Sequence, residues 1–243
     1  METRPQGVTK GQVVRILGLD IETAPALVYT FSLRDTTIGV DQIVKPGRVL
    51  CWSAKWFGEK KVHYCDERSG KKKMLEAIKE LMTSADAVVT YNGDGFDLQK
   101  LNGEFVYHRI PPCPPLTSID LWKTTKSLGY DSGKLAFLVR HLKIGEKVKN
   151  AGFPLWVGCM NGDEKCWRDM RQYNITDTAL LEDAYNILRP YIKNHPRMGP
   201  GCPVCQSTKS QARGVRRTRA TITQRMQCQD CGAWFAGSSR RAA

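Results

Sequence analysis

The sequence contains no apolar run that approaches the ~18 residues needed for a membrane-spanning helix. Its first eleven residues, METRPQGVTKG, also lack the ~7–15-residue apolar core of a signal peptide. No internal repeat is visible along the chain. These absences argue against a membrane protein and a repeat array, and they predict a soluble, cytoplasmic protein with no membrane partner.

Acidic residues are few relative to basic ones. The 243 residues include 24 Asp and Glu against 37 Lys and Arg, which gives a formal net charge of +13. The charge alone is also compatible with a soluble protein that is simply basic. A surplus of this size nevertheless favours a polyanionic partner, and nucleic acid is the usual one.

The nine cysteines do not suggest a disulfide framework, because their number is odd and the chain is expected to be intracellular. Five of them are scattered and are expected to be small buried hydrophobes: Cys51, Cys65, Cys113, Cys159 and Cys166. The other four form two CxxC pairs near the C-terminus, which is a pattern typical of metal binding.

Hydrophobic patterning predicts a mixed α/β protein. Strands are predicted over residues 13–22, 49–57, 87–91 and 116–121, with one more ending near residue 65. Helices are predicted over residues 72–82, 98–105 and 135–142, and from about 164 to 193. The segment 145–163, rich in Gly and Lys, is expected to be irregular. Strands followed by alternating strands and helices are typical of a mixed sheet flanked by helices.

The composition changes at residues 195–200, where we place a domain boundary. From residue 199 onward the chain holds eight Lys or Arg against one acid, Asp230, a net charge of +7. The predicted parts are a flexible N-terminus, a main domain, a cysteine module and a flexible tail, over residues 1–11, 12–195, 199–237 and 238–243.

Two segments place carboxylates at predicted strand ends. In LDIET (residues 19–23), Asp20 and Glu22 project to one face of a strand, about 6.6 Å apart along the backbone. A divalent cation such as Mg²⁺ would relieve their repulsion. In YNGDGFD (residues 91–97), Asp97 follows a short strand, near the edge where open α/β sheets place active sites. The simpler alternatives are a surface pair and a helix cap.

A third segment, YNITD (residues 173–177), lies in a predicted helix. Asp177 shares a face with an apolar stripe made of Leu180, Leu181, Ala184, Leu188 and Tyr191. An unpaired buried charge is costly, so Asp177 is expected to meet a metal ion or a hydrogen-bonded partner. Here the functional interpretation is favoured over the structural one.

The order LDIET, YNGDGFD, YNITD resembles the three motifs of the DnaQ-like 3′→5′ exonucleases, whose fold is RNase H-like. Tyr173, four residues before Asp177, is similar to the tyrosine (DEDDy) subgroup found in proofreading domains of family-B DNA polymerases. The histidine subgroup would have His at position 172, which is Gln172 here. Residues 134–147 resemble the helix and loop between the second and third motifs, and the resemblance spans about residues 12–192.

This resemblance implies an RNase H-like mixed sheet flanked by helices and a two-metal hydrolysis of phosphodiester bonds. Asp20, Glu22, Asp97 and Asp177 would hold two Mg²⁺ or Mn²⁺ ions, and Tyr173 would orient the attacking water. The implied partner is nucleic acid with a free 3′ end, with single-stranded DNA favoured.

Three further residues near these motifs have open roles. Asn92 would shape the turn in the second motif or contact the terminal nucleotide. Phe96 would contact nucleic acid or pack beneath the site as an ordinary core aromatic. Asp120, at the end of its own strand, would support the site or cap a helix.

The two CxxC pairs predict a closed structural Zn²⁺ site with four thiolates, Cys202, Cys205, Cys228 and Cys231. This region resembles the zinc ribbons of transposases and transcription proteins. Trp234 would stack on a base or, preferably, cover the small core of the ribbon. Between the inner cysteines lie cations expected to bind phosphates, namely Lys209, Arg213, Arg216, Arg217, Arg219 and Arg225.

The sequence therefore favours an exonuclease whose ribbon helps to bind substrate. One alternative is a nucleic-acid-binding adaptor that uses the nuclease fold as a scaffold, although no motif carboxylate is missing. The other is a proofreading accessory to a separate polymerase, in a replication or repair complex, since the chain is too short to include a polymerase domain.

Overall fold

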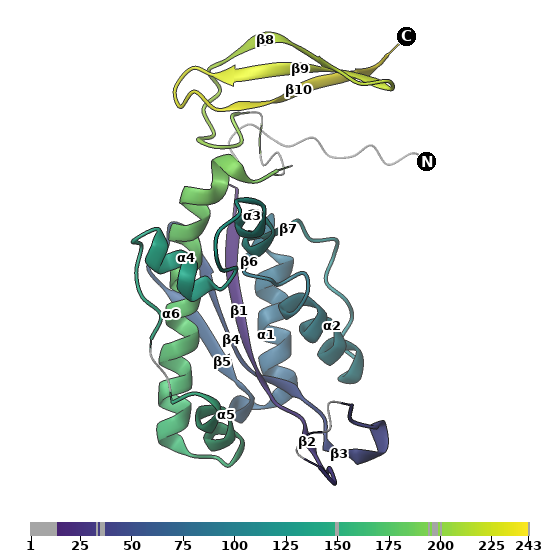
Figure 1. Ribbon diagram of the computed structural model, residues 1–243, viewed down its shortest axis with the longest axis vertical. Helices are drawn as coiled ribbons and strands as arrows, with labels where there is room; N and C mark the ends of the chain where they lie inside the picture. The colour runs from purple at the N-terminus through teal and green to yellow at the C-terminus, as the bar shows by residue number, and fades with distance from the viewer. Residues whose placement is uncertain are drawn as a thin grey trace. The chain divides into compact units, whose positions relative to one another are not determined.

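The computed structural model describes residues 14–32, 34, 37–148, 151–193, 195, 199 and 201–242. The chain divides into two compact units, of which one is Ile16–Tyr191 and the other contains the C-terminal segment from Ile192 (Figure 1). The flexible N-terminus expected over residues 1–11 lies outside the described residues.

The first unit is built on a five-stranded mixed sheet with the strand order β5-β4-β1-β6-β7. The central strand β1 (Ile16–Ala24) pairs antiparallel with β4 (Arg48–Trp56) and parallel with β6 (Ala87–Thr90). β5 (Val62–Asp66) extends the antiparallel side, and β7 (Ser118–Asp120) extends the parallel side. The mixed α/β class predicted from the sequence is confirmed.

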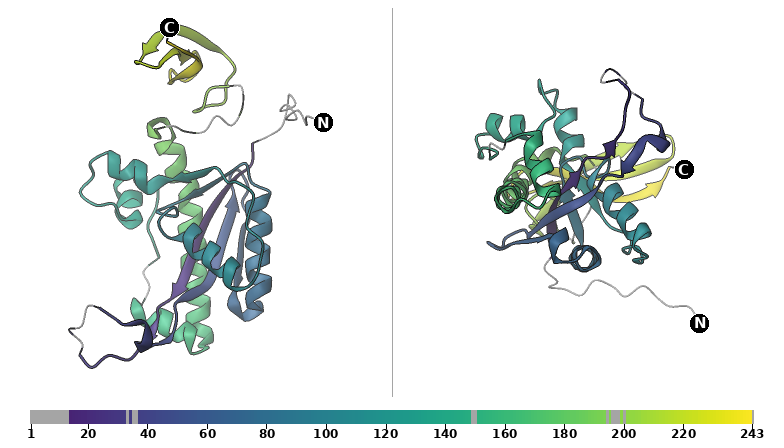
Figure 2. Two further views of the ribbon diagram at one scale, coloured as in Figure 1. Left: turned by 90° about the vertical axis from the view of Figure 1, so that its right-hand side faces the viewer. Right: turned by 90° about the horizontal axis from the view of Figure 1, so that it is seen from below.

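Helices cover both faces of this sheet (Figures 1 and 2). α1 (Lys71–Thr83) and α2 (Asp97–Tyr107) pack on one face. The long α6 (Glu164–Leu188) packs on the other face together with α5 (Phe153–Met160). None of the helices in the described ranges is long and apolar enough to cross a membrane.

Side chains of β1 alternate between the two helical layers, as a strand requires. Leu17, Leu19 and Ile21 belong to the buried core that includes residues of α1 and α2. Asp20 and Glu22 therefore project toward the opposite layer. Two carboxylates of β1 therefore lie on the side of the sheet that α6 covers.

The segment 145–163 is only partly irregular, which corrects the sequence expectation. Its residues 153–160 form α5, which begins with proline at its first turn and buries Leu155 and Cys159 against β4 and α6. The helix α6 ends at Leu188, earlier than predicted, and continues as a short 3₁₀ turn. The remaining elements of this unit are β2 (Leu27–Val28), η1 (Val40–Gln42), β3 (Ile43–Lys45), η2 (Glu67–Ser69), α3 (Leu121–Ser127), α4 (Leu135–His141) and η3 (Arg189–Tyr191).

The second unit contains a three-stranded antiparallel sheet in the order β10-β9-β8. Its strands are β8 (Ser210–Arg217), β9 (Thr221–Cys228) and β10 (Trp234–Arg241). Residues 238–241, expected to belong to a flexible tail, are the second half of β10. Backbone pairing with β9 orders them, although their side chains are polar.

Candidate functional site

Three carboxylates predicted from separate motifs meet beside the central strand. Asp20 and Glu22 from β1 and Asp177 from α6 each place a carboxylate oxygen within 4.8 Å of the other two. Asp177 is buried on α6 together with Leu180, Leu181, Ala184 and Leu188 of the predicted apolar stripe, whereas Tyr191 lies beyond α6 and is exposed. The alternation of β1 and the packing of α6 against it bring these groups together.

Asn174 positions one of these carboxylates, and the sequence reasoning had given this residue no role. Its Nδ2 donates to Oδ2 of Asp20 at 2.6 Å, and the Asn174 side chain is fully buried. The Oγ of Ser53 on β4 donates to the Asn174 carbonyl at 2.8 Å, which ties α6 to the sheet at this point. The available signal was its place three residues before Asp177, on the same helical face.

Glu22 is held from α5, the helix that the sequence patterning missed. The indole Nε1 of Trp156 donates to Oε2 of Glu22 at 3.1 Å. The Trp156 ring also meets Tyr173 edge to face, with ring centroids 6.1 Å apart. α5 therefore connects the carboxylate cluster to the tyrosine predicted beside it.

Lys147 is a second residue whose role was missed, although its loop was part of the family resemblance. Its Nζ lies 2.5 Å from Oδ2 of Asp177 and donates to the hydroxyl of Tyr173 at 3.1 Å. Burial opposes the charge on Lys147, but Asp177 and Tyr173 outweigh it and raise the pKa of the ammonium group. Lys147 therefore remains a cation.

Asp97 is the first residue of α2, but it does not cap that helix. The cap position is Phe96, and the buried carboxylate of Asp97 instead accepts from the backbone N–H of Ile21 at 3.0 Å through Oδ1. Ile21 lies between Asp20 and Glu22 in β1. Asp97 is thus held at the edge of the three-carboxylate cluster without being part of it.

The pKa values of Asp20, Glu22, Asp97 and Asp177 are all raised above their ordinary values. Burial and then the neighbouring charges of Asp97, Glu22 and Asp177 raise the pKa of Asp20. Burial raises the pKa of Glu22 to about 7, although the hydrogen bond from Trp156 acts in the opposite direction. Burial also raises the pKa of Asp97 to about 7. Burial also raises the pKa of Asp177 despite Lys147.

The donor set fits divalent metal ions. Within the described chain, Oδ1 of Asp177 is buried and has no hydrogen-bond partner. Clustered carboxylate oxygens are the ligands that hard cations such as Mg²⁺ and Mn²⁺ prefer. A cation would satisfy the Asp177 oxygen and stabilise the charged form of carboxylates whose pKa values are raised by burial and, for Asp20 and Glu22, also by neighbouring charges.

Asn92 and Asp120 build the turn that leads to Asp97. Asn92 has a φ of 68°, a conformation that asparagine tolerates better than most residues, and its backbone N–H donates to Oδ1 of Asp120 at 2.7 Å. Oδ1 of Asp120 also accepts from the N–H of Trp122 at 3.0 Å and caps α3. Asp120 therefore both caps α3 and holds the turn of the second motif through the N–H groups of Asn92 and Asp94.

Phe96 does not pack beneath the site, since 37% of its surface is exposed. A groove of about 890 Å³ begins near it, along α2, and is lined by exposed Lys45, Lys100 and Tyr107. Its floor includes Val49, the register partner of Thr23, which directly follows Glu22. The groove thus shares α2 with Asp97, but Val49 belongs to the core on the α1 and α2 face, opposite the side to which Asp20 and Glu22 project.

The four predicted cysteine ligands cluster in the second unit. The Sγ atoms of Cys202 and Cys231 are 3.7 Å apart, those of Cys205 and Cys228 are 3.5 Å apart, and all four lie within 4.8 Å of one another. In a tetrahedral zinc site with Zn–S bonds of ~2.3 Å, the sulfur atoms lie ~3.8 Å from one another. Backbone N–H groups of Cys231 and Asp230 lower the pKa of Cys228 to about 7, which favours the thiolate. The spacing fits one zinc ion and is too long for disulfides.

The other cysteines and the predicted phosphate-binding cations are dispersed. Cys51 and Cys159 are buried as expected, whereas Cys65, Cys113 and Cys166 are only partly buried. Lys209 faces Asp230, with Nζ and Oδ1 3.7 Å apart. The five arginines are all exposed, on β8, on β9 and in the turn between them: Arg213, Arg216, Arg217, Arg219 and Arg225.

The sheet order and the carboxylates together define a class: an α/β domain whose central strand and long helix α6 meet at an acidic site that could hold metal ions. Comparison with protein families agrees, because a model of the RNase H superfamily matches residues 19–189, more than half of the chain. The chain belongs to the RNase H superfamily. This membership indicates a nuclease-type hydrolase that uses divalent metal ions and acts on nucleic acid. No curated protein matches the chain.

Proposed function

We propose that the protein is a metal-dependent 3′→5′ exonuclease that removes nucleotides from single-stranded ends, with DNA favoured. The observation that carries this proposal is the buried cluster of Asp20, Glu22 and Asp177 with an unsatisfied Asp177 oxygen. The 3′→5′ direction is supported by the resemblance of the three motifs to the DnaQ-like exonucleases with a tyrosine in the third motif.

The charge balance of the site supports two metal ions. Among the described residues, the site brings together four carboxylates, those of the cluster and Asp97, and the ammonium group of Lys147, which lies against Asp177. The excess of three negative charges is large for a buried site, and two divalent cations would bring it close to neutrality. When bound, the ions activate a water molecule and stabilise charge on the phosphate and the leaving 3′ oxygen.

The residues of the chain orient the reacting groups. Asn174 fixes Asp20, Trp156 fixes Glu22, and the Ile21 N–H fixes Asp97. Each carboxylate thus has one donor that holds its rotamer and leaves other lone pairs for metal ions.

Tyr173 would orient the attacking water rather than remove its proton. Burial and the charge of Asp177 raise the pKa of Tyr173 to about 12, so its hydroxyl stays protonated at neutral pH. That hydroxyl accepts from Lys147 and is hydrogen-bonded to Asp177, and in the proposed role its proton would turn to the water or to a phosphate oxygen. In this role the hydroxyl positions the nucleophile and is not the general base.

The substrate strand would leave the site along α2. Phe96, directly before Asp97, exposes a ring that can stack on the terminal base, and Asn92 shapes the turn beside it. The groove with Lys45 and Lys100 offers positive charge for the following phosphates. In the second unit, the four cysteines would hold a structural zinc ion, and exposed arginines on one face of the sheet would add affinity for nucleic acid.

The direct test uses single-stranded DNA and RNA oligonucleotides labelled at the 5′ end, incubated with Mg²⁺ or Mn²⁺ and, separately, with chelator. The proposal predicts a ladder of 3′-shortened products that chelator and Asp177→Asn abolish. Asp169→Asn is the matched control, because Asp169 lies on the same helix but is paired with Lys165 on its exposed face. Internal cleavage, 5′ shortening, or no metal-dependent cleavage would overturn the proposal.

A further inference from the structure

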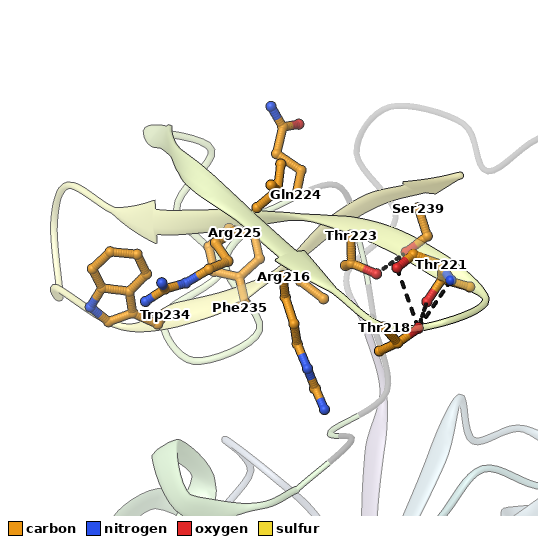
Figure 3. Close-up of a pocket in the computed structure, with 11 residues that line it drawn as sticks. Arg216, Thr218, Thr221, Thr223, Gln224, Arg225, Trp234, Phe235 and Ser239 are labelled. Carbon is orange, nitrogen blue, oxygen red and sulfur yellow. Dashed lines mark hydrogen bonds between the residues drawn. The ribbon is translucent and has the colours of Figure 1, made fainter. Parts of the chain in front are cut away.

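A hollow of about 830 Å³ lies against one side of the C-terminal sheet (Figure 3). The side chains that line it include an aromatic ring, arginines and hydroxyl groups. This volume lies within the ~300–1,000 Å³ typical of ligand sites. The hollow belongs to the second unit alone, and its lining residues come from β8, β9, β10 and the β8–β9 turn. The hollow is distinct from the cysteine cluster, because none of its lining residues is a cysteine.

The strand register determines which side chains share this side. Thr223 on β9 pairs with Arg216 on β8 and with Ser239 on β10. Trp234 pairs with the residue two positions beyond Arg225, so both project to the same side as Thr223. We call this side, with Arg216, Thr223, Arg225, Trp234 and Ser239, the platform face.

Its neighbours on the same strands project to the opposite side. Arg217 follows Arg216 on β8 and pairs with Ile222 on β9. Since successive side chains alternate, Arg217 and Ile222 lie on the far side of the sheet from Thr223. The arginines that the sequence presented as one basic set are therefore divided between two faces.

Trp234 does not cover a core, because 51% of its surface is exposed, and the preferred sequence interpretation of this residue was wrong. The Arg225 guanidinium carbon lies 4.7 Å from the centroid of the Trp234 ring system, and Figure 3 shows the two side chains together at one end of the hollow. A half-exposed indole with a stacked guanidinium offers both an aromatic surface and a positive charge to a ligand.

Hydroxyl groups occupy the other end of the hollow. Thr223 Oγ1 and Ser239 Oγ are 2.8 Å apart, and Thr218 Oγ1 and Thr221 Oγ1 are 2.9 Å apart (Figure 3). In the Thr223–Ser239 pair one hydroxyl hydrogen makes the bond, so the second hydrogen is available to a ligand. A phosphate oxygen or a sugar hydroxyl is a suitable acceptor.

The arginines of the platform face are open to an anionic ligand. Neither Arg216 nor Arg225 forms an ion pair with a carboxylate in the part of the chain that the structure describes. The acid of this segment, Asp230, instead accepts from Ser207 at 2.5 Å and faces Lys209. Both guanidinium groups are exposed, so a phosphate can reach them without displacing an internal partner.

We propose that the platform face binds single-stranded nucleic acid, with a base stacked on Trp234 and adjacent phosphates on Arg216 and Arg225. A single strand is favoured over a duplex because only an unpaired base can expose its flat surface to the indole. The proposal deepens the proposed function, since it rests on nucleic acid as the substrate class. It assigns the affinity of the C-terminal sheet for nucleic acid to one face rather than to arginines spread over both faces.

The test measures binding without hydrolysis. Full-length Asp177→Asn protein is titrated into fluorescent single-stranded DNA, single-stranded RNA or duplex DNA, with fluorescence anisotropy as the readout at two salt concentrations. Trp234→Ala, Arg216→Gln and Arg217→Gln are added to this background. Arg216→Gln and Arg217→Gln remove the same charge from adjacent positions, so they are matched controls for each other. Zinc content is measured for each variant to confirm that the cysteine site is intact.

The proposal predicts that Trp234→Ala weakens single-strand binding by about tenfold, as expected for loss of one stacked base. Arg216→Gln weakens binding and lowers its salt dependence, whereas Arg217→Gln stays within about twofold of the parent. Equal losses for the two arginine variants, an unchanged affinity for Trp234→Ala with zinc retained, or tighter binding of duplex would overturn the proposal. So would competition by poly-aspartate as strong as that by oligonucleotide.

Failure here is distinguishable from failure of the nuclease proposal. Cleavage of a trinucleotide by the wild-type chain depends on the carboxylates and has little need of the platform face. If the platform variants cleave the trinucleotide normally but lose affinity for longer strands, both proposals stand. If binding behaves as predicted but no substrate is cleaved, the platform stands and the exonuclease proposal fails.

Discussion

The side chain of Asn174 on α6 donates a 2.6 Å hydrogen bond to the carboxylate of Asp20 on β1, across 154 positions of sequence. This contact fixes the rotamer of one proposed metal ligand from the same helix that supplies another, Asp177. The Asn174 end of the contact is held by the sheet, because the Oγ of Ser53 donates to the Asn174 carbonyl. The contact therefore couples the packing of α6 to the geometry of the carboxylates.

Asn174→Ala is expected to weaken Mn²⁺ binding by about 10- to 100-fold, the usual cost of losing a residue that orients a metal ligand. Isothermal titration with Mn²⁺ measures the effect. Thr178→Val is the control for general destabilisation, since Thr178 is equally buried one turn along α6 and contacts Ser53 but not Asp20. Equal losses of Mn²⁺ affinity in the two variants would show that Asn174 acts only through packing.

Lys147→Met removes the ammonium group that lies against Asp177 and Tyr173. Without metal, this variant should melt at a lower temperature, because a buried carboxylate loses its charged partner. Divalent ions should then stabilise it more than they stabilise the wild type, since the repulsion between Lys147 and a bound cation is gone. Thermal melts of both proteins with and without Mg²⁺ measure this difference. An equal Mg²⁺-induced shift in the two would contradict the proposed competition.

The pH dependence of stability follows from the raised pKa of Glu22. Burial raises its pKa in the folded state to about 7, above its ordinary value of 4.5, so the folded state binds the proton more tightly than the unfolded state. In metal-free protein, the contribution of Glu22 to stability is therefore fully favourable below about pH 4.5 and is lost as pH rises through about 7.

Comparison with Glu22→Gln isolates this contribution. The melting temperature of the variant should match that of the wild type near pH 5 and exceed it at pH 8, where Glu22 is charged and repelled by Asp177. Saturating Mg²⁺ should reverse the order at pH 8, because only the carboxylate holds the ion well. A difference that does not change with pH would mean that Glu22 titrates normally.

Loss of the cysteine site should leave the carboxylate chemistry in place. Replacing Cys228 and Cys231 with serine is expected to release about one zinc ion per chain, because a closed site needs all four thiolates. Melting of the C-terminal sheet should follow, since so small a sheet lacks a core of its own. Elemental analysis measures zinc, and trinucleotide cleavage measures the first unit. Retained zinc, or complete loss of trinucleotide cleavage, would contradict this separation.

Much of the fold and of the acidic site could be predicted from the sequence because these features have short-range signatures. β1 shows as an apolar run that ends in Asp20 and Glu22, and Asp177 shows as a charge within an apolar helical stripe. Each signature depends on a few neighbouring residues and on the period of a strand or helix.

The supporting residues could not be predicted because their roles depend on long-range contacts. Trp156 acts through Glu22, which is 134 positions away, and the eight residues of α5 that carry it, FPLWVGCM, are too few and too uniformly apolar to show a helical period. Lys147 lies in a loop and meets Asp177 only because α6 packs on the sheet. The position of Trp234 could not be predicted for a similar reason: only the register of β9 and β10 shows that its ring lies on the opposite side of the sheet from Met226.

The measurement that tests the central claim most directly is cleavage of an oligonucleotide whose last linkage carries a sulfur in place of a non-bridging phosphate oxygen. If ions held by Asp20, Glu22 and Asp177 contact that oxygen, cleavage should be slow with Mg²⁺ and should recover with the softer Mn²⁺, because sulfur is a poor ligand for Mg²⁺. Asp177→Asn should remain inactive with either ion. Equal rates on the sulfur and oxygen substrates in Mg²⁺, or cleavage of either without a divalent ion, would contradict the account.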